Sequence, residues 1–480
     1  MLKLKQSYQK LRHSKNNQHT SIISISRSVF LLGGESMTKT IIIGANHSGI
    51  AAANTILDND PNHEVVMIDR SDCISYLGTG SALWIGRQID SYESLFYTSG
   101  ADFEKKGAKV YLKTEVNHID FESKKVTCFS HERGQFDESY DQLIIGTGSK
   151  PIALNVPGNK LTNIHYLKTF QEAKLIDKLL DQEDVKTVAV IGAGYIGIEI
   201  AEAAKLRNKK VLLFDVAKRS VPSYFDEWLT TDMDKALNDN GVELHFNEEV
   251  KSIQGVNNKV EGITTNQGTY QVDVVINAIG FMPNTSLAKN QLETYRNGAY
   301  LVDSFQRTSE PDVYAIGDCG TVFSNALNKQ TYIALATNAV RTGIVAGLNA
   351  VGIKTKSNGV QGSNGISIFG LNMVSTGVSV ESALKNKIVV DYTDFEDLQK
   401  PAFMKKNDLV KIRIVFEKNS RRVVGAQLSS YEDISSVIHM FSLAIEKQVT
   451  IDELKLLDIF FLPHFNQPYN YITMASLGAN

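Results

Sequence analysis

The sequence predicts an α/β protein with two Rossmann-like three-layer domains and a C-terminal α+β domain. Two observations lead to this fold class. A strand, a glycine-rich turn, a helix and a second strand ending in an acidic residue follow one another over residues 40–69, and the same succession returns over 187–215. From about residue 366 onward, strand-like runs alternate with an amphipathic helix, without such a turn. The internal duplication is the strongest organisational feature of the chain.

Length, charge and cysteine content limit the classes of protein to consider. At 480 residues, the chain is long enough for about three domains. The formal net charge of -3 gives no bias toward nucleic acid or an anionic membrane, so neither is expected as a partner. No apolar run is long enough for a transmembrane helix. The 3 cysteines lack the spacing of a disulfide framework or a metal site, which favours a reducing, cytoplasmic location without a bound metal.

Residues 1–36 differ from the rest of the chain and are rich in Ser, Asn, Gln and Lys. Three interpretations stay open. The segment can be a disordered tail, or a transit peptide that is Ser-rich and nearly free of acids but poor in Arg. It can also be a non-native extension, because Gly33-Gly34-Glu35 can be encoded by a purine-rich ribosome-binding sequence one codon before Met37. We favour a start at Met37 and assign residues 1–36 no part in the fold.

The first βαβ unit begins with the apolar run TIIIG at residues 40–44. A helix is expected from Gly49, and the strand EVVMI leads to Asp69. The turn reads GANHSG, so Asn46 stands where a middle glycine would allow the closest approach to a pyrophosphate. Taken alone, this turn is a moderate dinucleotide-binding signal, and the pairing with the second unit strengthens it.

The second unit carries a complete motif of Gly192, Gly194 and Gly197 between the strands 187–191 and 211–215. The first glycine permits a tight turn, the second lets the backbone approach a pyrophosphate, and the third lets the helix, expected over 198–206, pack on the strand. The helix N-terminus then faces the phosphates with its positive dipole end. These features predict a dinucleotide site.

The acidic end of the second strand bears on the choice of nucleotide. Asp215 lies where a carboxylate accepts hydrogen bonds from ribose hydroxyls, and it would repel a 2′-phosphate, which favours NADH over NADPH. Lys218 and Arg219 follow closely and weaken this preference.

The remaining elements are expected around and after the two units. A charged, β-rich stretch covers 109–141, and a linker covers 354–365. Further strands are expected over 143–148, 272–280, 313–318 and 411–416, and a helix over 434–447.

Seven stretches, in order along the chain, carry a resemblance to a known family. They are IIIGANHSGIAAA (41–53), ISYLGTGSALWIG (74–86), LIIGTGSKP (143–151), VIGAGYIGIEIAE (190–202), AIGFMPNT (278–285), VYAIGDC (313–319) and FLPHFNQPYNY (461–471). From about residue 38 to its end, the chain resembles the FAD-dependent pyridine nucleotide-disulfide oxidoreductases. Within them it is most similar to the branch of NADH oxidases, NADH peroxidases and CoA-disulfide reductases.

The resemblance implies a domain order and a homodimer. Residues 37–155 and 286–358 would form a discontinuous FAD-binding domain, 156–285 an NAD-binding domain, and 359–480 a dimerisation domain. In this family, aromatic residues near the C-terminal end of one subunit approach the flavin of the other. Phe461 and His464 are therefore candidates for the wall of the partner's site, and a packed C-terminal tail is the alternative.

The resemblance also implies cofactor-binding residues. FAD would be held by Gly44, Asn46, His47, Ser48, Gly49, Asp69, Gly146, Thr147, Gly148 and Asp318. NADH would be held by Gly192, Gly194, Tyr195, Ile196, Gly197, Asp215 and Gly280. His47 would lie near the flavin and the oxygen site, where an imidazole can donate to a developing peroxide or shuttle a proton, so it is a catalytic candidate. A histidine bonded to backbone at a helix N-terminus is the alternative.

The chain departs from the family at the redox cysteine, where SYLGTG replaces the family's SFLxCG and puts Thr79 at the cysteine position. A threonine forms no thiolate, sulfenic acid or mixed disulfide. This argues against disulfide reduction, peroxidase action and four-electron reduction of oxygen to water. Cys73 is more typical of a packed thiol, and Cys319 belongs to a motif with no redox role in the family.

The leading hypothesis is an FAD-dependent NADH oxidase in which FAD takes hydride from NADH, the electrons pass to molecular oxygen, and the product is hydrogen peroxide. The alternatives are a water-forming NADH oxidase with Cys73 as relay, an NADH-dependent reductase of a quinone or a ferredoxin-like protein, and an NADH-responsive regulatory flavoprotein.

Overall fold

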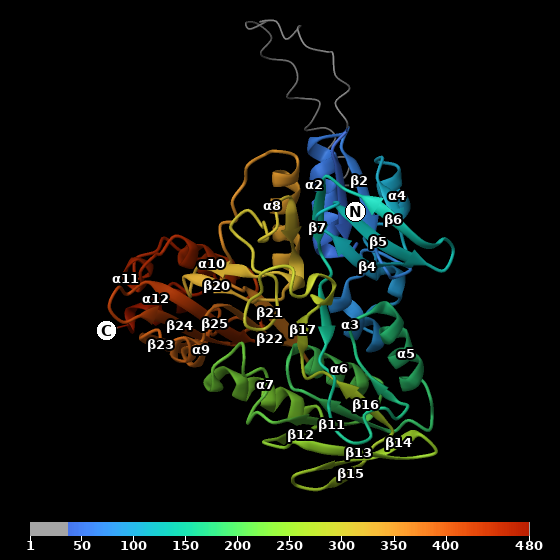
Figure 1. Ribbon diagram of the computed structural model, residues 1–480. Helices are drawn as coiled ribbons and strands as arrows, with labels where there is room; N and C mark the ends of the chain where they lie inside the picture. Colours follow the sequence, from blue (N-terminus) through green and yellow to red (C-terminus); the bar gives the residue numbers. More distant parts are fainter. Residues whose placement is uncertain (1–36, 480) are drawn as a thin grey trace, which may run out of the picture. The chain divides into compact units, whose positions relative to one another are not determined.

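A computed structural model gives the fold, and residues 37–479 of it are described (Figure 1). The prediction about residues 1–36 lies outside these residues. The α/β class is confirmed, with parallel sheets in two parts of the chain and an antiparallel sheet in the last. Within the described range, none of the helices combines the length and apolar character needed to span a membrane.

The first unit is built on a five-stranded parallel sheet in the order β18-β7-β1-β2-β3. Its strands are β1 (Lys39–Ile43), β2 (Glu64–Ile68), β3 (Lys109–Tyr111), β7 (Gln142–Ile145) and β18 (Val313–Ala315). Two helices, α2 (His47–Asn59) and α8 (Ala336–Ala350), pack closely together, since a Cβ at Gly343 would come within 2.2 Å of the Ser48 carbonyl. A three-stranded antiparallel sheet also belongs to this part: β4 (Thr114–Asp120), β5 (Lys125–Ser130) and β6 (Gly134–Ser139).

The second unit repeats this plan with a parallel sheet in the order β12-β11-β10-β16-β9. Its strands are β9 (Ile164–His165), β10 (Thr187–Ile191), β11 (Lys210–Asp215), β12 (Val242–Phe246) and β16 (Val274–Asn277). Its helices are α5 (Phe170–Leu180), α6 (Tyr195–Leu206) and α7 (Glu227–Asp239), and its antiparallel sheet is β13 (Val250–Val256), β14 (Lys259–Thr265) and β15 (Thr269–Gln271).

Both glycine-turn helices begin earlier than the sequence predicts. Helix α2 starts at His47 instead of Gly49, and α6 starts at Tyr195 instead of Ile198. The last residues of each glycine motif already adopt helical geometry, because the third glycine packs inside the first helical turn. The N-terminal N–H groups of each helix therefore belong to the glycine turn itself.

The C-terminal part is a five-stranded antiparallel sheet in the order β21-β22-β25-β24-β23, which confirms the expected α+β module (Figure 1). Its strands are β21 (Asn364–Ile368), β22 (Leu371–Gly377), β23 (Val390–Leu398), β24 (Leu409–Glu417) and β25 (Val423–Ser430). Its helices are α9 (Val380–Lys385), α10 (Val437–Glu446), α11 (Ile451–Leu454) and α12 (Tyr471–Leu477).

Short elements connect these parts. They are the 3-10 turns η1 (Gly78–Gly80), η2 (Tyr92–Leu95), η3 (Ser286–Ala288) and η4 (Gly317–Cys319), the helices α3 (Ser81–Ile85) and α4 (Gly100–Glu104), and the strands β8 (Ser149–Pro151), β17 (Phe281–Pro283), β19 (Val322–Ser324) and β20 (Lys329–Thr331). Strands β8 and β17 pair antiparallel, so the chain leaves the first sheet and returns to it side by side. The domain boundaries at residues 155 and 285 stay a prediction.

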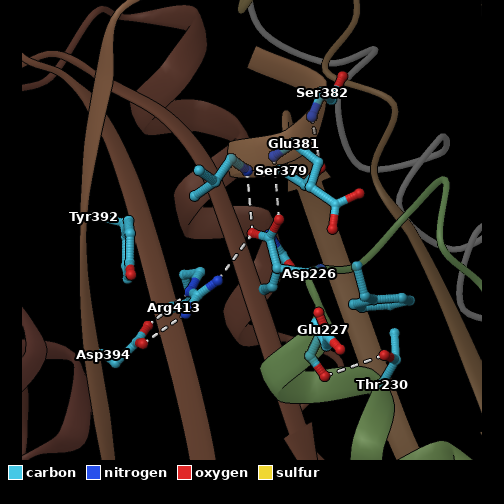
Figure 2. Close-up of polar contacts among 12 residues, drawn as sticks. Asp226, Glu227, Thr230, Ser379, Glu381, Ser382, Tyr392, Asp394 and Arg413 are labelled. Carbon is cyan, nitrogen blue, oxygen red and sulfur yellow. Dashed lines mark hydrogen bonds and ion pairs between the residues drawn. The ribbon is translucent and has the colours of Figure 1, made fainter. Parts of the chain in front are cut away.

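A buried polar cluster joins helix α7 to the C-terminal sheet (Figure 2). Asp226 is 2% exposed and accepts hydrogen bonds from the Val380 and Glu381 N–H groups and from Gln427 Nε2 at 2.7 Å. The Arg413 guanidinium lies 3.4 Å from Asp226 and donates two 2.7 Å hydrogen bonds to Asp394. A buried carboxylate is tolerated here because donors and a cation compensate it.

Candidate functional site

A cavity of about 1540 Å³ is lined by residues from both Rossmann-like units and by Ser363, Asn364 and Gly365 of the C-terminal part. The carboxyl ends of β1, β2, β10 and β11 contribute to it, as expected for ligand sites in open α/β sheets. It is lined by all but two of the predicted cofactor-binding residues and by Thr79.

Those two exceptions are the third glycines of the motifs, and they have a packing role. A Cβ at Gly49 would lie 1.9 Å from the Gly44 carbonyl oxygen, and one at Gly197 would lie 1.8 Å from that of Gly192. Each helix therefore approaches its own strand too closely for any side chain at this position. This matches the mechanical role that the sequence assigns to the third glycine.

The middle position differs between the two turns as predicted. A Cβ at Gly194 would meet no atom within 4 Å, although this residue lines the cavity, so the backbone of the second turn is open to a ligand. At the matching place in the first turn, Asn46 turns its amide to the Tyr76 carbonyl, 3.1 Å away. Neither residue caps its helix through a side chain, which leaves helix N–H groups available to phosphate oxygens.

The two acids at the strand ends make the same pair of hydrogen bonds. Asp69 accepts from the N–H groups of Ala45 and Ser71, each at 2.7 Å. Asp215 accepts from Ala193 at 2.6 Å and from Ala217 at 2.7 Å. Each carboxylate thus holds its own glycine turn and still has free lone pairs, as acceptance of ribose hydroxyls requires.

Lys218 and Arg219 do not line the cavity, and each forms an ion pair with a glutamate. Lys218 pairs with Glu227 at 2.6 Å. Arg219 is 5% exposed and pairs with Glu381 at 2.8 Å. The weakening of the NADH preference that the sequence attributes to them has no geometric support.

A polar group lies where the return strand of the first sheet meets η4. Asp318 accepts a 2.8 Å hydrogen bond from Ser149 Oγ, and Lys168 Nζ lies 2.9 Å from that oxygen and 3.5 Å from the carboxylate. Lys168 Nζ also lies 4.7 Å from the centre of the Phe281 ring. All four residues line the cavity. The sequence predicts only Asp318, since Ser149 has no assigned role within the stretch 143–151 and Lys168 lies in none of the quoted stretches.

His47 is half-buried at the start of α2, and its Nδ1 lies 3.1 Å from the Tyr97 hydroxyl. Burial lowers the pKa of His47, the nearby Asp318 carboxylate raises it, and Lys168 lowers it again. The net lowering favours a neutral imidazole at neutral pH. Thr79 lies on η1 and is exposed to the same cavity.

The two cysteines that the sequence considers differ in position. Cys319 is fully buried, with its Sγ 3.2 Å from the carbonyl oxygens of Ile145 and Ile316, and does not line the cavity. Cys73 does line it, but burial and the adjacent Asp72 raise the pKa of its thiol to about 11. This thiol stays protonated at neutral pH, unlike a reactive cysteine.

Glu199 is a cavity residue that the sequence reasoning misses. It lies on α6, where burial and the neighbouring Glu202 raise its pKa to about 7. The signal for it is a carboxylate three residues before Glu202 on a mostly apolar helix. Nearby, the Tyr195 ring stacks on Tyr224 at 4.3 Å, and its hydroxyl donates to Asn364 of β21.

Phe461 and His464 are exposed and, within one chain, do not line the cavity. Their predicted role depends on a second subunit and stays a prediction.

Comparison with known proteins gives a consistent assignment. The family model of pyridine nucleotide-disulphide oxidoreductases matches residues 38–343, and that of their dimerisation domain matches 365–470. An NADH oxidase of Lactococcus lactis subsp. cremoris is 55% identical over 444 residues, covering 92% of this chain and 100% of that protein. An NADH oxidase of Streptococcus pyogenes serotype M6 is 48% identical over 457 residues, with the same coverage.

Among solved structures, the water-forming NADH oxidase from Lactobacillus brevis bound to NADH is 35% identical. It superimposes with a TM-score of 0.89 over 92% of this chain and 98% of that one. The two family models together span most of the sequence, and the relatives align along nearly their whole length. The chain therefore belongs to the pyridine nucleotide-disulphide oxidoreductase family.

Proposed function

We propose that the protein is an FAD-dependent NADH oxidase that reduces oxygen to hydrogen peroxide. The names of the curated relatives support NADH oxidation. Thr79 at the position of the redox cysteine carries the proposal of peroxide as product, because a threonine cannot be oxidised and regenerated. A water-forming relative, the Lactobacillus brevis enzyme, makes water formation the second candidate.

The cavity residues fit the two nucleotides. Residues of the first turn would hold FAD phosphates, and Asp69 would accept the ribose hydroxyls of its adenosine. Asp318, with Lys168 beside it, would bind FAD where the first sheet ends. The open backbone at Gly194 and the carboxylate of Asp215 would hold NADH. FAD, when bound, accepts a hydride from NADH and passes the electrons on to an acceptor.

His47 would act on oxygen while it is being reduced. The imidazole is neutral at neutral pH, because burial lowers its pKa, and a neutral imidazole carries one N–H donor. That donor would stabilise the negative charge that develops on oxygen. The reaction NADH + H⁺ + O₂ → NAD⁺ + H₂O₂ takes its single proton from solvent.

An oxygen electrode with catalase tests the product. The purified, FAD-loaded protein is expected to consume oxygen with NADH, and catalase added after the consumption should return about half of the oxygen taken up. No return after brisk uptake would mean that water is formed. In that case Cys73 becomes the suspected relay, and Cys73→Ser would restore the return of oxygen. Negligible uptake would contradict the oxidase proposal and favour another acceptor or a regulatory role.

We infer that the protein forms a homodimer in a reducing, cytoplasmic compartment. The matched dimerisation domain supports the dimer. Phe460 and Phe465, 67% and 57% exposed, would be covered by the second subunit, which would bring Phe461 and His464 to its partner's cavity. All three cysteines are free thiols, which supports the inference of a reducing compartment.

The nucleotide preference is expected to depend on the charge of Asp215. Asp215→Asn keeps one oxygen acceptor for the glycine turn and removes the repulsion of a 2′-phosphate. The ratio of kcat/KM for NADH over NADPH should fall by about tenfold, which corresponds to the loss of one charge interaction. Asp69→Asn is the matched control, because Asp69 makes the equivalent bonds in the other turn and should leave this ratio unchanged. An unchanged ratio in both variants would contradict the role of Asp215.

The raised pKa of Glu199 predicts a pH dependence of stability. Below about pH 4.5, its carboxyl is protonated in the folded and the unfolded chain. Between this pH and about 7, the unfolded chain loses the proton and the folded chain keeps it, so the free energy of unfolding falls as pH rises. Glu199→Gln removes this loss and should stabilise the protein above pH 7 by at most about 3 kcal/mol.

Thermal unfolding of the FAD-free protein at pH 5 and pH 8 measures this effect. The difference in Tm between Glu199→Gln and the unmodified protein should be larger at pH 8. Glu132→Gln, at an exposed position, is the control and should change Tm equally at both pH values. A Glu199→Gln shift that is independent of pH would show that the carboxyl titrates normally.

A further inference from the structure

Tyr97 lies in an extended segment that is fastened to the segment leading to Thr79. The Leu77 N–H donates to the Leu95 carbonyl at 2.9 Å, and Ser75 Oγ donates to the Thr98 carbonyl at 2.6 Å. Tyr76 and Phe96 form a bridge between the two segments. Because bonds on both sides of Tyr97 hold its backbone, its side chain stands at a defined place beside His47.

The side chain of Tyr97 contacts His47 in two ways. Its hydroxyl lies 3.1 Å from His47 Nδ1, and the two rings are nearly parallel, at 6°, with their centres 5.9 Å apart. Partial burial raises the pKa of Tyr97 to about 12, so the phenol keeps its proton at physiological pH. A neutral imidazole has one nitrogen that accepts, and a phenol facing it can donate.

The other ring nitrogen of His47 is left for the cavity. His47 lines the cavity whereas Tyr97 does not, and Nδ1 faces Tyr97, so Nε2 is the ring nitrogen available to a cavity ligand. Among residues 37–479, Nε2 has no hydrogen-bond partner in the protein. The bond at one imidazole nitrogen determines which nitrogen carries the hydrogen.

We propose that Tyr97 is a positioning residue that donates to His47 Nδ1 and thereby keeps the hydrogen on Nε2, directed at oxygen as it is reduced. This rests on the proposed oxidase function. Tyr97 transfers no proton in this role. Without its hydroxyl, the imidazole can take either tautomer and can rotate, and the donor is no longer preorganised. Asp318 and Lys168 are the charged groups that act on the same imidazole, with opposite effects on its pKa.

Tyr97→Phe tests the proposal, because it removes the hydroxyl and keeps the ring. Tyr92→Phe is the matched control: Tyr92 lies on the same stretch of chain and contacts Trp84 and Phe170 instead of His47. The first readout is the tautomer of His47, measured by ¹⁵N NMR of the FAD-loaded protein labelled at histidine and assigned with His47→Asn. Tyr97→Phe should convert a single Nε2–H tautomer into a mixture, and Tyr92→Phe should not.

The second readout separates the two halves of the reaction. In Tyr97→Phe, the rate constant for reaction of the NADH-reduced protein with oxygen should fall about tenfold, while anaerobic reduction by NADH stays unchanged. The pH profile of the oxygen reaction should also change, since the protonation of His47 is no longer tied to one tautomer. Equal effects on both half-reactions would mean a merely structural role.

An unchanged tautomer, or an unchanged oxygen rate with an altered tautomer, would overturn the proposal. If the unmodified protein does not consume oxygen with NADH, the oxidase function fails instead. The NMR measurement then still decides whether Tyr97 sets the tautomer of His47.

Discussion

Replacing Thr79 by cysteine is expected to move the product from hydrogen peroxide toward water. Thr79 is exposed on η1 and lines the cavity that also contains His47. Replacing its side chain by the slightly smaller side chain of cysteine therefore disturbs no packing. A thiolate there can attack peroxide, which breaks the O–O bond and, with one proton from solvent, gives a sulfenic acid and water. Two electrons from a second NADH then return the sulfur to the thiolate and release a second water.

The ratio of NADH oxidised to oxygen consumed measures this change. It should rise from about one in the unmodified protein toward about two in Thr79→Cys, and the oxygen returned by catalase should fall in parallel. Thr79→Ser is the control, because it keeps a hydroxyl and cannot form a sulfenic acid. A Thr79→Cys protein that binds FAD and still returns half of its oxygen would show that a cysteine at this position does not reach the peroxide.

Removing the carboxylate of Asp226 is expected to lower the free energy of unfolding by about 3–5 kcal/mol. The side chain is 2% exposed and serves several donors at once, among them the Val380 N–H, Gln427 and the guanidinium of Arg413 (Figure 2). Asp226→Ala leaves the Val380 N–H and the Gln427 amide without this acceptor and removes one of the two carboxylates beside Arg413. A buried unpaired group costs more than a lost surface contact.

Chemical denaturation followed by fluorescence compares this variant with Glu227→Ala. Glu227 is the next residue, but its side chain is exposed and forms a surface ion pair with the exposed Lys218, so its loss should cost at most about 1 kcal/mol. Because a chain of several domains need not unfold in one step, the first transition is the quantity to compare. Equal losses in the two variants would mean that the buried cluster contributes no more than a surface ion pair.

The sequence predicted those parts of the fold and site that depend on local pattern. The glycine turns at Gly44 and Gly192, the apolar strands before them and the acids after them are encoded within about thirty residues each. The physical demand is local, since a close approach of helix to strand excludes any side chain at Gly49 and Gly197. The absence of a thiol at Thr79 is likewise visible without coordinates.

Contacts between distant segments could not be predicted in this way. Lys168 lies beside Asp318 although they are 150 positions apart in the sequence, and Tyr97 contacts His47 although they are 50 positions apart. Lys168 and Tyr97 belong to no periodic pattern and no motif, so only the packing of the segments against one another brings each to its partner. The same holds for Lys218 and Arg219, whose charges the sequence assigned to the nucleotide site and whose partners lie elsewhere.

By itself, then, the sequence determined the two nucleotide-binding units, their cofactor class and the missing redox sulfur, because backbone geometry and covalent chemistry are properties of the residues themselves. The tertiary structure decided which charges face the cavity, which cysteine lines it and which hydroxyl contacts the imidazole of His47. Protonation and hydrogen bonding depend on burial and on neighbours, and neighbours are a property of the folded chain.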